Sequence, residues 1–171
     1  MDKETALNFL KHHQPMPNDD LLDKKTIFMY DEVRKYFLNN PDDECLPLLL
    51  NSFGEYNGFG VYQLVEDVIL KFDHKKVVNC LLEALKSHHK GVKYWCIQIC
   101  ASFPDTRLIF SLNDLLNDPN EDIRISVITA LSQIQDEKVI LLLKDNLKNE
   151  NNETVKSFLL EVLDDVESDA R

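Results

Sequence analysis

The chain has 171 residues, of which 44% are hydrophobic and 29% charged, so it is long enough to bury a core within a single domain. It has only four glycines and six prolines, too few for the frequent turns of a many-stranded β fold, so helices are expected. Its formal net charge of −11 disfavours nucleic-acid binding, because phosphate backbones would be repelled, and would instead attract a basic protein.

The four cysteines lie in apolar segments and lack the paired spacing of a zinc site or a disulfide framework. Cys96 and Cys100 are one helical turn apart, which suits small core residues. The N-terminus does not resemble a signal peptide, and no apolar run approaches the roughly 18 residues of a membrane span. We therefore expect a cytoplasmic protein with reduced thiols, no membrane contact, no metal and no cofactor.

Residues 1–24 are predicted to form a helix from Thr5 to His12, followed by a loop that contains two prolines. We expect this segment to cap the apolar edge of the structure that follows. The next break is at residues 41–43, Pro-Asp-Asp, where the acidic residues suit the start of a helix.

Residues 53–60 read Phe-Gly-Glu-Tyr-Asn-Gly-Phe-Gly and contain three of the four glycines, so a loop of unusual shape is expected there. It is not a phosphate loop, because the glycine order is wrong, no strand precedes it and no Lys-Ser/Thr follows. Two interpretations stay open: a connector whose aromatic side chains cover a junction between repeats, or a patch that recognises a partner. The candidate residues of such a patch are Glu55, Tyr56, Tyr62, Glu66, Asp67, Tyr94 and Trp95.

From residue 60 onwards, the apolar pattern recurs every 31 or 32 residues. Within each unit the apolar positions fall at offsets of 0, 4, 7, 8 and 11, which trace one stripe of an α-helix. Three of the recurring columns are Val65, Cys96, Val127 and Leu159; Val68, Ile99, Ala130 and Val162; and Ile69, Cys100, Leu131 and Leu163. A second helix in each unit repeats as well, with Leu81, Leu112 and Leu143 in one column.

The residues between these helices agree with the repeat. Asp105 and Asp136 precede the second helices, where a carboxylate can cap free N–H groups. A helix pair of this length cannot bury its apolar stripe alone, so neighbouring pairs must stack. The sequence predicts an all-α, right-handed α-solenoid of about four helix pairs over residues 25–166, with terminal capping helices and a frayed acidic tail at residues 167–171.

Residues 116–124, Leu-Asn-Asp-Pro-Asn-Glu-Asp-Ile-Arg, resemble the start of a bacterial HEAT-like repeat. In that family a D-P-x-x-x-[VI]-R stretch opens the first helix, and its arginine bonds to neighbouring repeats. Arg124 holds this position, Lys93 and Lys156 are its equivalents, and Tyr62 departs from the pattern. The resemblance covers residues 60–166 well and residues 25–59 more loosely.

No GxSxG, HExxH or DxDxDG motif is present, and nothing fixes a pair of carboxylates in a cleft, so we expect no enzyme activity. The resemblance implies a protein-binding module, such as an immunity protein that neutralises a basic, nuclease-type toxin. We expect the partner to bind one ridge on the outward face of the second helices, because its residues align at 31-residue spacing. These residues are Asn79, Glu83, Phe110, Asp114, Leu141 and Asp145.

Two other functions stay open. One is a nucleic-acid enzyme similar to the DNA glycosylases built of HEAT-like repeats, which would use Asp67, Tyr94 and Trp95. The acidic residues of the predicted ridge argue against it, since such enzymes resemble clamps with a basic concave face. The other is a general scaffold or chaperone adaptor.

Overall fold

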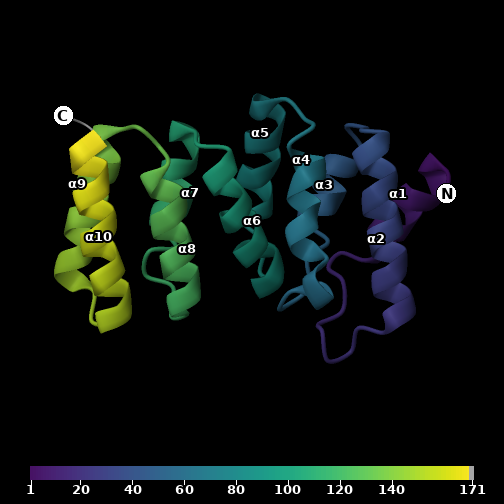
Figure 1. Ribbon diagram of the computed structural model, residues 1–171, viewed down its shortest axis with the longest axis horizontal. Helices are drawn as coiled ribbons and strands as arrows, with labels where there is room; N and C mark the ends of the chain where they lie inside the picture. The colour runs from purple at the N-terminus through teal and green to yellow at the C-terminus, as the bar shows by residue number, and fades with distance from the viewer. Residues whose placement is uncertain (170–171) are drawn as a thin grey trace. The chain divides into compact units, whose positions relative to one another are not determined.

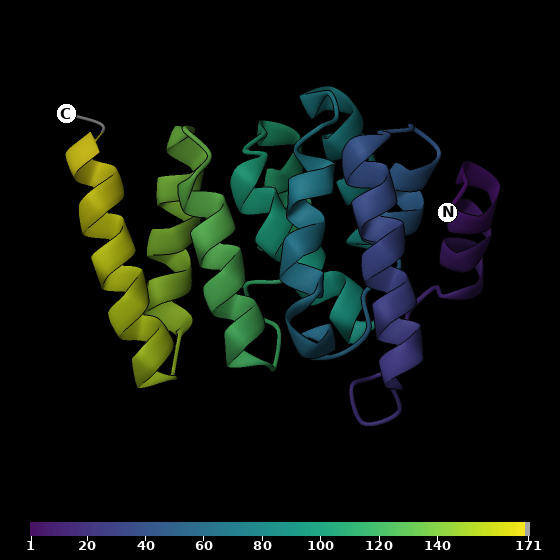
Figure 2. The ribbon, with the colours of Figure 1, turned by 45° about the vertical axis from the view of Figure 1, so that its right-hand side comes forward.

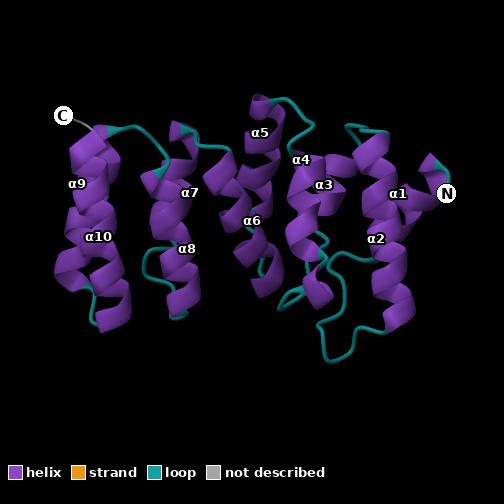
Figure 3. Cartoon of the chain, in the orientation of Figure 1, coloured by secondary structure: helices purple, strands orange, loops and turns teal. Residues whose placement is uncertain are grey.

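The structure, a computed structural model, describes residues 1–169, which form helices and loops without any strand (Figures 1 and 3). The chain divides into two compact units, residues 1–96 and the residues from Ile97 onwards. This division differs from the predicted boundaries at residues 24 and 166, which stay predictions. The all-α fold class is confirmed.

The first unit contains five complete helices and the first half of a sixth. They are α1 (Lys3–His12), α2 (Lys24–Asn39), α3 (Cys45–Leu50), α4 (Glu66–Ile69), α5 (His74–Ala84) and the start of α6 (Lys90–Ser102), with short 3-10 turns at η1 (Gly58–Gly60) and η2 (Tyr62–Val65). The helix α1 packs against α2 and α3, and α3 packs against α5. The helix predicted from Thr5 begins two residues earlier, because Asp2 caps it by accepting a hydrogen bond from the Thr5 N–H at 2.8 Å.

The second unit contains the rest of α6 and four further helices. They are α7 (Ile109–Asn113), which the 3-10 turn η3 (Thr106–Leu108) precedes, α8 (Glu121–Ser132), α9 (Glu137–Asn149) and α10 (Glu153–Asp169). The helix α7 packs against α8, and α10, yellow in Figure 2, packs against both α8 and α9. Four helix pairs therefore follow one another along the chain, α2/α3, α4/α5, α6/α7 and α8/α9, and α10 closes the described part.

The three central columns of the predicted repeat are buried at every position. Burying one large aliphatic side chain contributes about 1.5–3 kcal/mol, so these columns contribute strongly to stability. The outer columns are less uniform, since Val61, Phe72 and Val166 are only half-buried. The predicted periodicity thus identifies core positions, and the outer columns lie where the helices reach the edge of the core.

The predicted caps of the second helices are also present. The Asp105 carboxylate accepts a hydrogen bond from the Arg107 N–H at 2.9 Å, and the Asp136 carboxylate accepts one from the Lys138 N–H at 2.8 Å. Asp73 caps α5 in the same way. Each cap of this kind contributes about 1 kcal/mol and sets where its helix begins.

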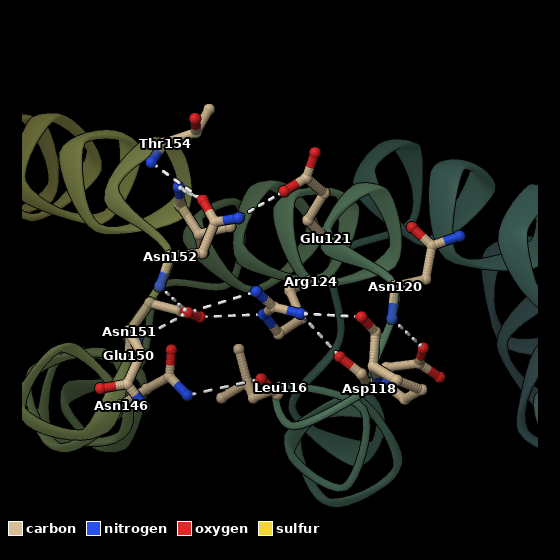
Figure 4. A network of polar contacts seen from close by, with 12 residues as sticks. Leu116, Asp118, Asn120, Glu121, Arg124, Asn146, Glu150, Asn151, Asn152 and Thr154 are labelled. Carbon is tan, nitrogen blue, oxygen red and sulfur yellow. Dashed lines mark hydrogen bonds and ion pairs between the residues drawn. The ribbon is translucent and has the colours of Figure 1, made fainter.

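Arg124 on α8 joins two successive repeats of the second unit (Figure 4). Its Nε and Nη2 donate to the two carboxylate oxygens of Glu150, at 2.9 and 3.2 Å, and its Nη1 donates to the carbonyl of Asp118 at 2.8 Å. The side chains of Arg124 and Glu150 are only 13% and 7% exposed. The inter-repeat role that the resemblance implies for Arg124 is therefore confirmed.

The carboxylate of Glu150 also fixes the start of the last helix (Figure 4). It accepts hydrogen bonds from the N–H groups of Asn151 and Asn152, and the Asn152 side chain in turn caps α10 through Thr154. Burial alone would raise the pKa of Glu150, but the hydrogen bonds from Asn152 and Arg124 outweigh it and lower this pKa below its ordinary value. Arg124 and Glu150 together thus connect the loop before α8, through the Asp118 carbonyl, to the beginning of α10.

The acidic end of the chain is in part helical. Residues 167–169 belong to α10, and Glu167 forms an ion pair with Lys144 of α9. The rest of the predicted frayed tail, residues 170–171, lies outside the described residues. Among residues 1–169, no helix is both long and apolar enough to span a lipid bilayer.

Replacing Arg124 with alanine is expected to lower the free energy of unfolding by about 2 kcal/mol, because Glu150 would be left nearly buried without its cation. Urea denaturation measures this change. Lys86→Ala is the matched control: it removes an exposed ion pair with Glu83, which lies at the C-terminal end of α5, and should leave stability unchanged. Equal losses in the two variants would contradict the structural role of Arg124.

The lowered pKa of Glu150 predicts how stability depends on pH. As the pH falls below about 4.5, the unfolded carboxyl group takes up its proton before the folded one, so the stability that Glu150 contributes is present above this pH and is lost below it. The difference in unfolding free energy between the wild type and Glu150→Gln should be constant near neutral pH and shrink on acidification. A difference that grows towards low pH would contradict the assignment.

Candidate functional site

An aromatic cluster supports the glycine-rich loop of the first unit. The Tyr62 ring stands edge-on to Tyr30 and Phe53, with ring centroids 5.6 and 5.7 Å apart, and Trp95 of α6 stacks on Phe53 at 5.9 Å. Because Ser52 donates its hydroxyl proton to the Leu49 carbonyl, Tyr30 donates to Ser52 Oγ at 2.7 Å. These contacts give the loop a rigid, buried base.

Three side chains from other segments hold the loop backbone. Trp95 Nε1 donates to the Tyr56 carbonyl at 2.8 Å, and the Asp19 carboxylate accepts from the Gly58 N–H at 3.0 Å. Asn18 accepts from the Glu55 N–H at 3.2 Å. These hydrogen bonds therefore hold both the first and the second half of the loop. The helix α6 also approaches the loop so closely that any side chain on Gly91 would collide with the backbone of Gly54.

Two aromatic residues of this loop have a left-handed backbone conformation. Tyr56 has φ of 70° and Phe59 has φ of 51°, in a region that costs a residue with a side chain about 1–2 kcal/mol. Their side chains are 70% and 61% exposed, so burial of the rings does not offset this cost. Strain of this kind persists only where surrounding contacts impose it, and it is typical of functional sites.

The structure corrects part of the predicted recognition patch. Tyr62 is wrong as a contact residue, because its ring is buried beneath the loop and burial raises its pKa to about 12. Trp95 is half-buried and uses its N–H within the protein, while Tyr94 is half-buried with its ring edge-on to Trp95. Of the four aromatic residues predicted for this patch, Tyr56 is the one that is exposed.

The acidic members of that patch differ in their exposure. Glu55 and Glu66 are half-buried and Asp67 is exposed, with the last two in the single turn of α4. Sequence reasoning missed the exposed Phe28 of α2, which shares a hollow of about 440 Å³ with Phe59. Phe28 is a large apolar residue outside the recurring columns, and this position could have identified it as an exposed candidate contact residue.

A second exposed apolar surface lies on the second helices of the second unit. Phe110 of α7 and Leu141 of α9, 31 residues apart, are 76% and 67% exposed. They lie at two adjoining hollows of about 470 and 680 Å³, both of which are lined by Ile109 and Leu142. We call this surface, with its four apolar residues, the α7/α9 groove.

The other residues of the predicted ridge are on the surface as well. Asp114 and Asp145 are exposed in the second unit, and Asn79 and Glu83 are exposed on α5 in the first unit. A single ridge through both units stays a prediction.

Cations near these acids were missed in the sequence reasoning. Glu83 pairs with Lys86, and Asp145 with Lys148 one helical turn later. Lys138, Leu141, Asp145 and Lys148 are spaced by three or four residues, so their shared helical face could have been read from the sequence.

Within the described residues, no three His, Cys, Asp or Glu side chains lie close enough together to hold a metal ion. All four cysteines are free thiols, and burial raises the pKa values of Cys45 and Cys100 to about 12, which keeps them protonated and unreactive at neutral pH.

The successive helix pairs and their recurring apolar stripe define the α-solenoid class of all-α proteins. A protein-family model described as HEAT repeats matches residues 78–164, just over half of the chain. The chain therefore belongs to the HEAT repeat family, whose members are typically protein-interaction modules. A comparison with curated proteins gave no match.

The loop geometry predicts different costs for two glycine substitutions. Gly58 and Gly60 both have positive φ, but a Cβ on Gly58 would lie 2.7 Å from the Tyr62 ring, whereas one on Gly60 would meet only Gln63 at 3.8 Å. Gly58→Ala should therefore reduce the free energy of unfolding by about 1–3 kcal/mol more than Gly60→Ala. Chemical denaturation of both variants checks this, and equal losses would show that the ring does not press on the loop.

Proposed function

We propose that the chain is a non-catalytic protein-binding module and that its partner docks on the outward face of the second helices. The exposure of Phe110 and Leu141 at equivalent repeat positions carries this proposal. The core column of the same helices, Leu81, Leu112 and Leu143, is buried throughout, so Phe110 and Leu141 are exposed apolar residues on the opposite side of the pattern. Leaving one large apolar side chain in water forgoes about 1.5–3 kcal/mol of burial free energy, which a bound partner would recover.

The composition of this surface is that of a protein interface. Its centre is apolar, with Ile109 and Leu142 lining both hollows beside the two exposed anchors, and charged side chains line the hollows as well. Interfaces commonly combine a few large apolar anchors with a polar rim that excludes water. The loop surface of the first unit, with exposed Tyr56 and Asp67, is a second candidate contact.

The net charge supports a narrower form of the proposal, in which the partner is a basic protein. Residues 111–171 contain 14 acidic and 6 basic residues, a net charge of −8, so the chain would attract a basic partner over long range. Neutralising a basic nuclease-type toxin, as immunity proteins do, is a function of this kind. The four free thiols support a cytoplasmic location.

The double variant Phe110→Ser/Leu141→Ser is expected to lose its partner while keeping its fold, because both side chains are on the surface and support no core. Affinity capture from lysate of the source cells, with the wild type beside the variant, measures the loss. We expect the wild type to retain a stoichiometric partner and the variant to retain at least about tenfold less.

Leu160→Ser is the matched control, since Leu160 is exposed on α10 and does not line the groove. Equal retention by the wild type and the double variant would contradict the proposed surface. The narrower proposal has its own test: Glu83→Lys, Asp114→Lys and Asp145→Lys together should slow association with a basic partner at low salt. If the association rate is unchanged, the partner is not basic.

A further inference from the structure

We infer that the α7/α9 groove binds an acidic amphipathic helix of a protein partner. The inference rests on the proposed function and specifies the segment that docks. It differs from what the overall negative charge of the chain suggests, because most of the charged residues that line the groove are basic.

The floor of the groove suits the apolar face of a helix. Ile109 and Leu142 line both hollows, while Phe110 and Leu141 rise beside them as exposed anchors. The larger hollow, of about 680 Å³, has room for more than one apolar side chain. Helices that dock in grooves insert residues at positions i, i+3, i+4 and i+7, and a floor that continues from one helix to the next accommodates such a row.

The charged residues around this floor are mostly basic. From Ile97 onwards the chain has 15 acidic and 7 basic residues, a net charge of −8. Four of those seven basic residues line the two hollows, but only two of the 15 acidic residues do. The basic residues are Arg107, Lys138, Lys144 and Lys148, and the acidic ones are Asp136 and Asp145.

The ion pairs of Lys144 and Lys148 do not prevent these two lysines from meeting a ligand, whereas Arg107 is held by Asp105 through hydrogen bonds from its Nε and Nη2. Lys148 pairs with Asp145 at 3.3 Å, with both side chains more than 70% exposed, and the Lys144 side chain that pairs with Glu167 is 50% exposed. Exposed pairs of this kind contribute little free energy, so their exchange for a partner's carboxylates costs little. Asp136 is already used as the cap of α9.

A protein helix fits this surface better than nucleic acid or an anionic membrane does. A polyanion extends far beyond the groove and would meet the net charge of −11, whereas a short acidic segment interacts mainly with the lysines within a Debye length of about 8 Å. The two apolar anchors also require an apolar counterpart, which a phosphate backbone lacks. A basic partner protein can present such a segment, because its net charge governs the encounter and the segment governs docking.

Two synthetic helical peptides of about 18 residues test the inference against the full chain. Both have leucine at i, i+3, i+4 and i+7 and alanine at most other positions, and a few positions on the opposite face are glutamate in one peptide and lysine in the other. Fluorescence anisotropy at physiological salt should show that the glutamate peptide binds at least about tenfold more tightly than the lysine peptide. Failure of the glutamate peptide to bind, or tighter binding of the lysine peptide, overturns the inference.

Variants locate the binding. The triple variant Lys138→Glu/Lys144→Glu/Lys148→Glu should bind the glutamate peptide at least about tenfold more weakly than the wild type. The triple glutamine variant, which perturbs the fold less, should also bind this peptide more weakly. The matched control replaces Lys75, Lys86 and Lys90 of the first unit with glutamate, which changes the net charge equally. An equal loss in this control means that only the overall charge matters, and the inference fails.

The remaining outcomes separate this inference from the proposed function. If duplex DNA or phosphatidylserine vesicles bind to the groove and this binding is lost in the lysine variants, the ligand of the groove is a polyanion and not an acidic helix. If a partner is captured through Phe110 and Leu141 while the glutamate peptide does not bind, the proposed function stands and the acidic helix does not.

Discussion

A short amphipathic helix pair leaves its apolar stripe uncovered, and this constraint governs the rest of the structure. Each first helix buries the same three positions, represented by Val127, Ala130 and Leu131, against neighbouring helices. Because burial repeats with the 31-residue period, the opposite face of each second helix is free to vary. The exposed Phe110 and Leu141 lie on that free face, so the scaffold and the proposed interface use different sides of the same repeat.

Periodicity and local chemistry made much of the fold predictable. The columns, the caps at Asp105 and Asp136 and the junction at Arg124 each depend on residues close together in sequence or one repeat apart. The burial of Tyr62 was not predictable, because it depends on the path of the preceding loop. Three successive residues of this loop, Gly58 to Gly60, have positive φ. No repeat column describes such a path.

Charge shows the same limit of sequence reasoning. The net charge is a property of the whole chain, and it supports a basic partner at long range. The charge at a contact depends on which side chains the helices turn towards one groove, and around Leu141 these are mainly lysines. Encounter and docking can therefore favour opposite signs within one interface.

The position that Arg124 occupies in one repeat is occupied by Tyr62 in another, so the two units rely on different physics at equivalent places. The desolvation penalty of a nearly buried ion pair falls on heating, whereas aromatic burial weakens on cooling. Repeat proteins unfold as linked segments, not always as one cooperative block. The two halves can consequently melt at separate temperatures, and a single transition midpoint would then average two distinct events.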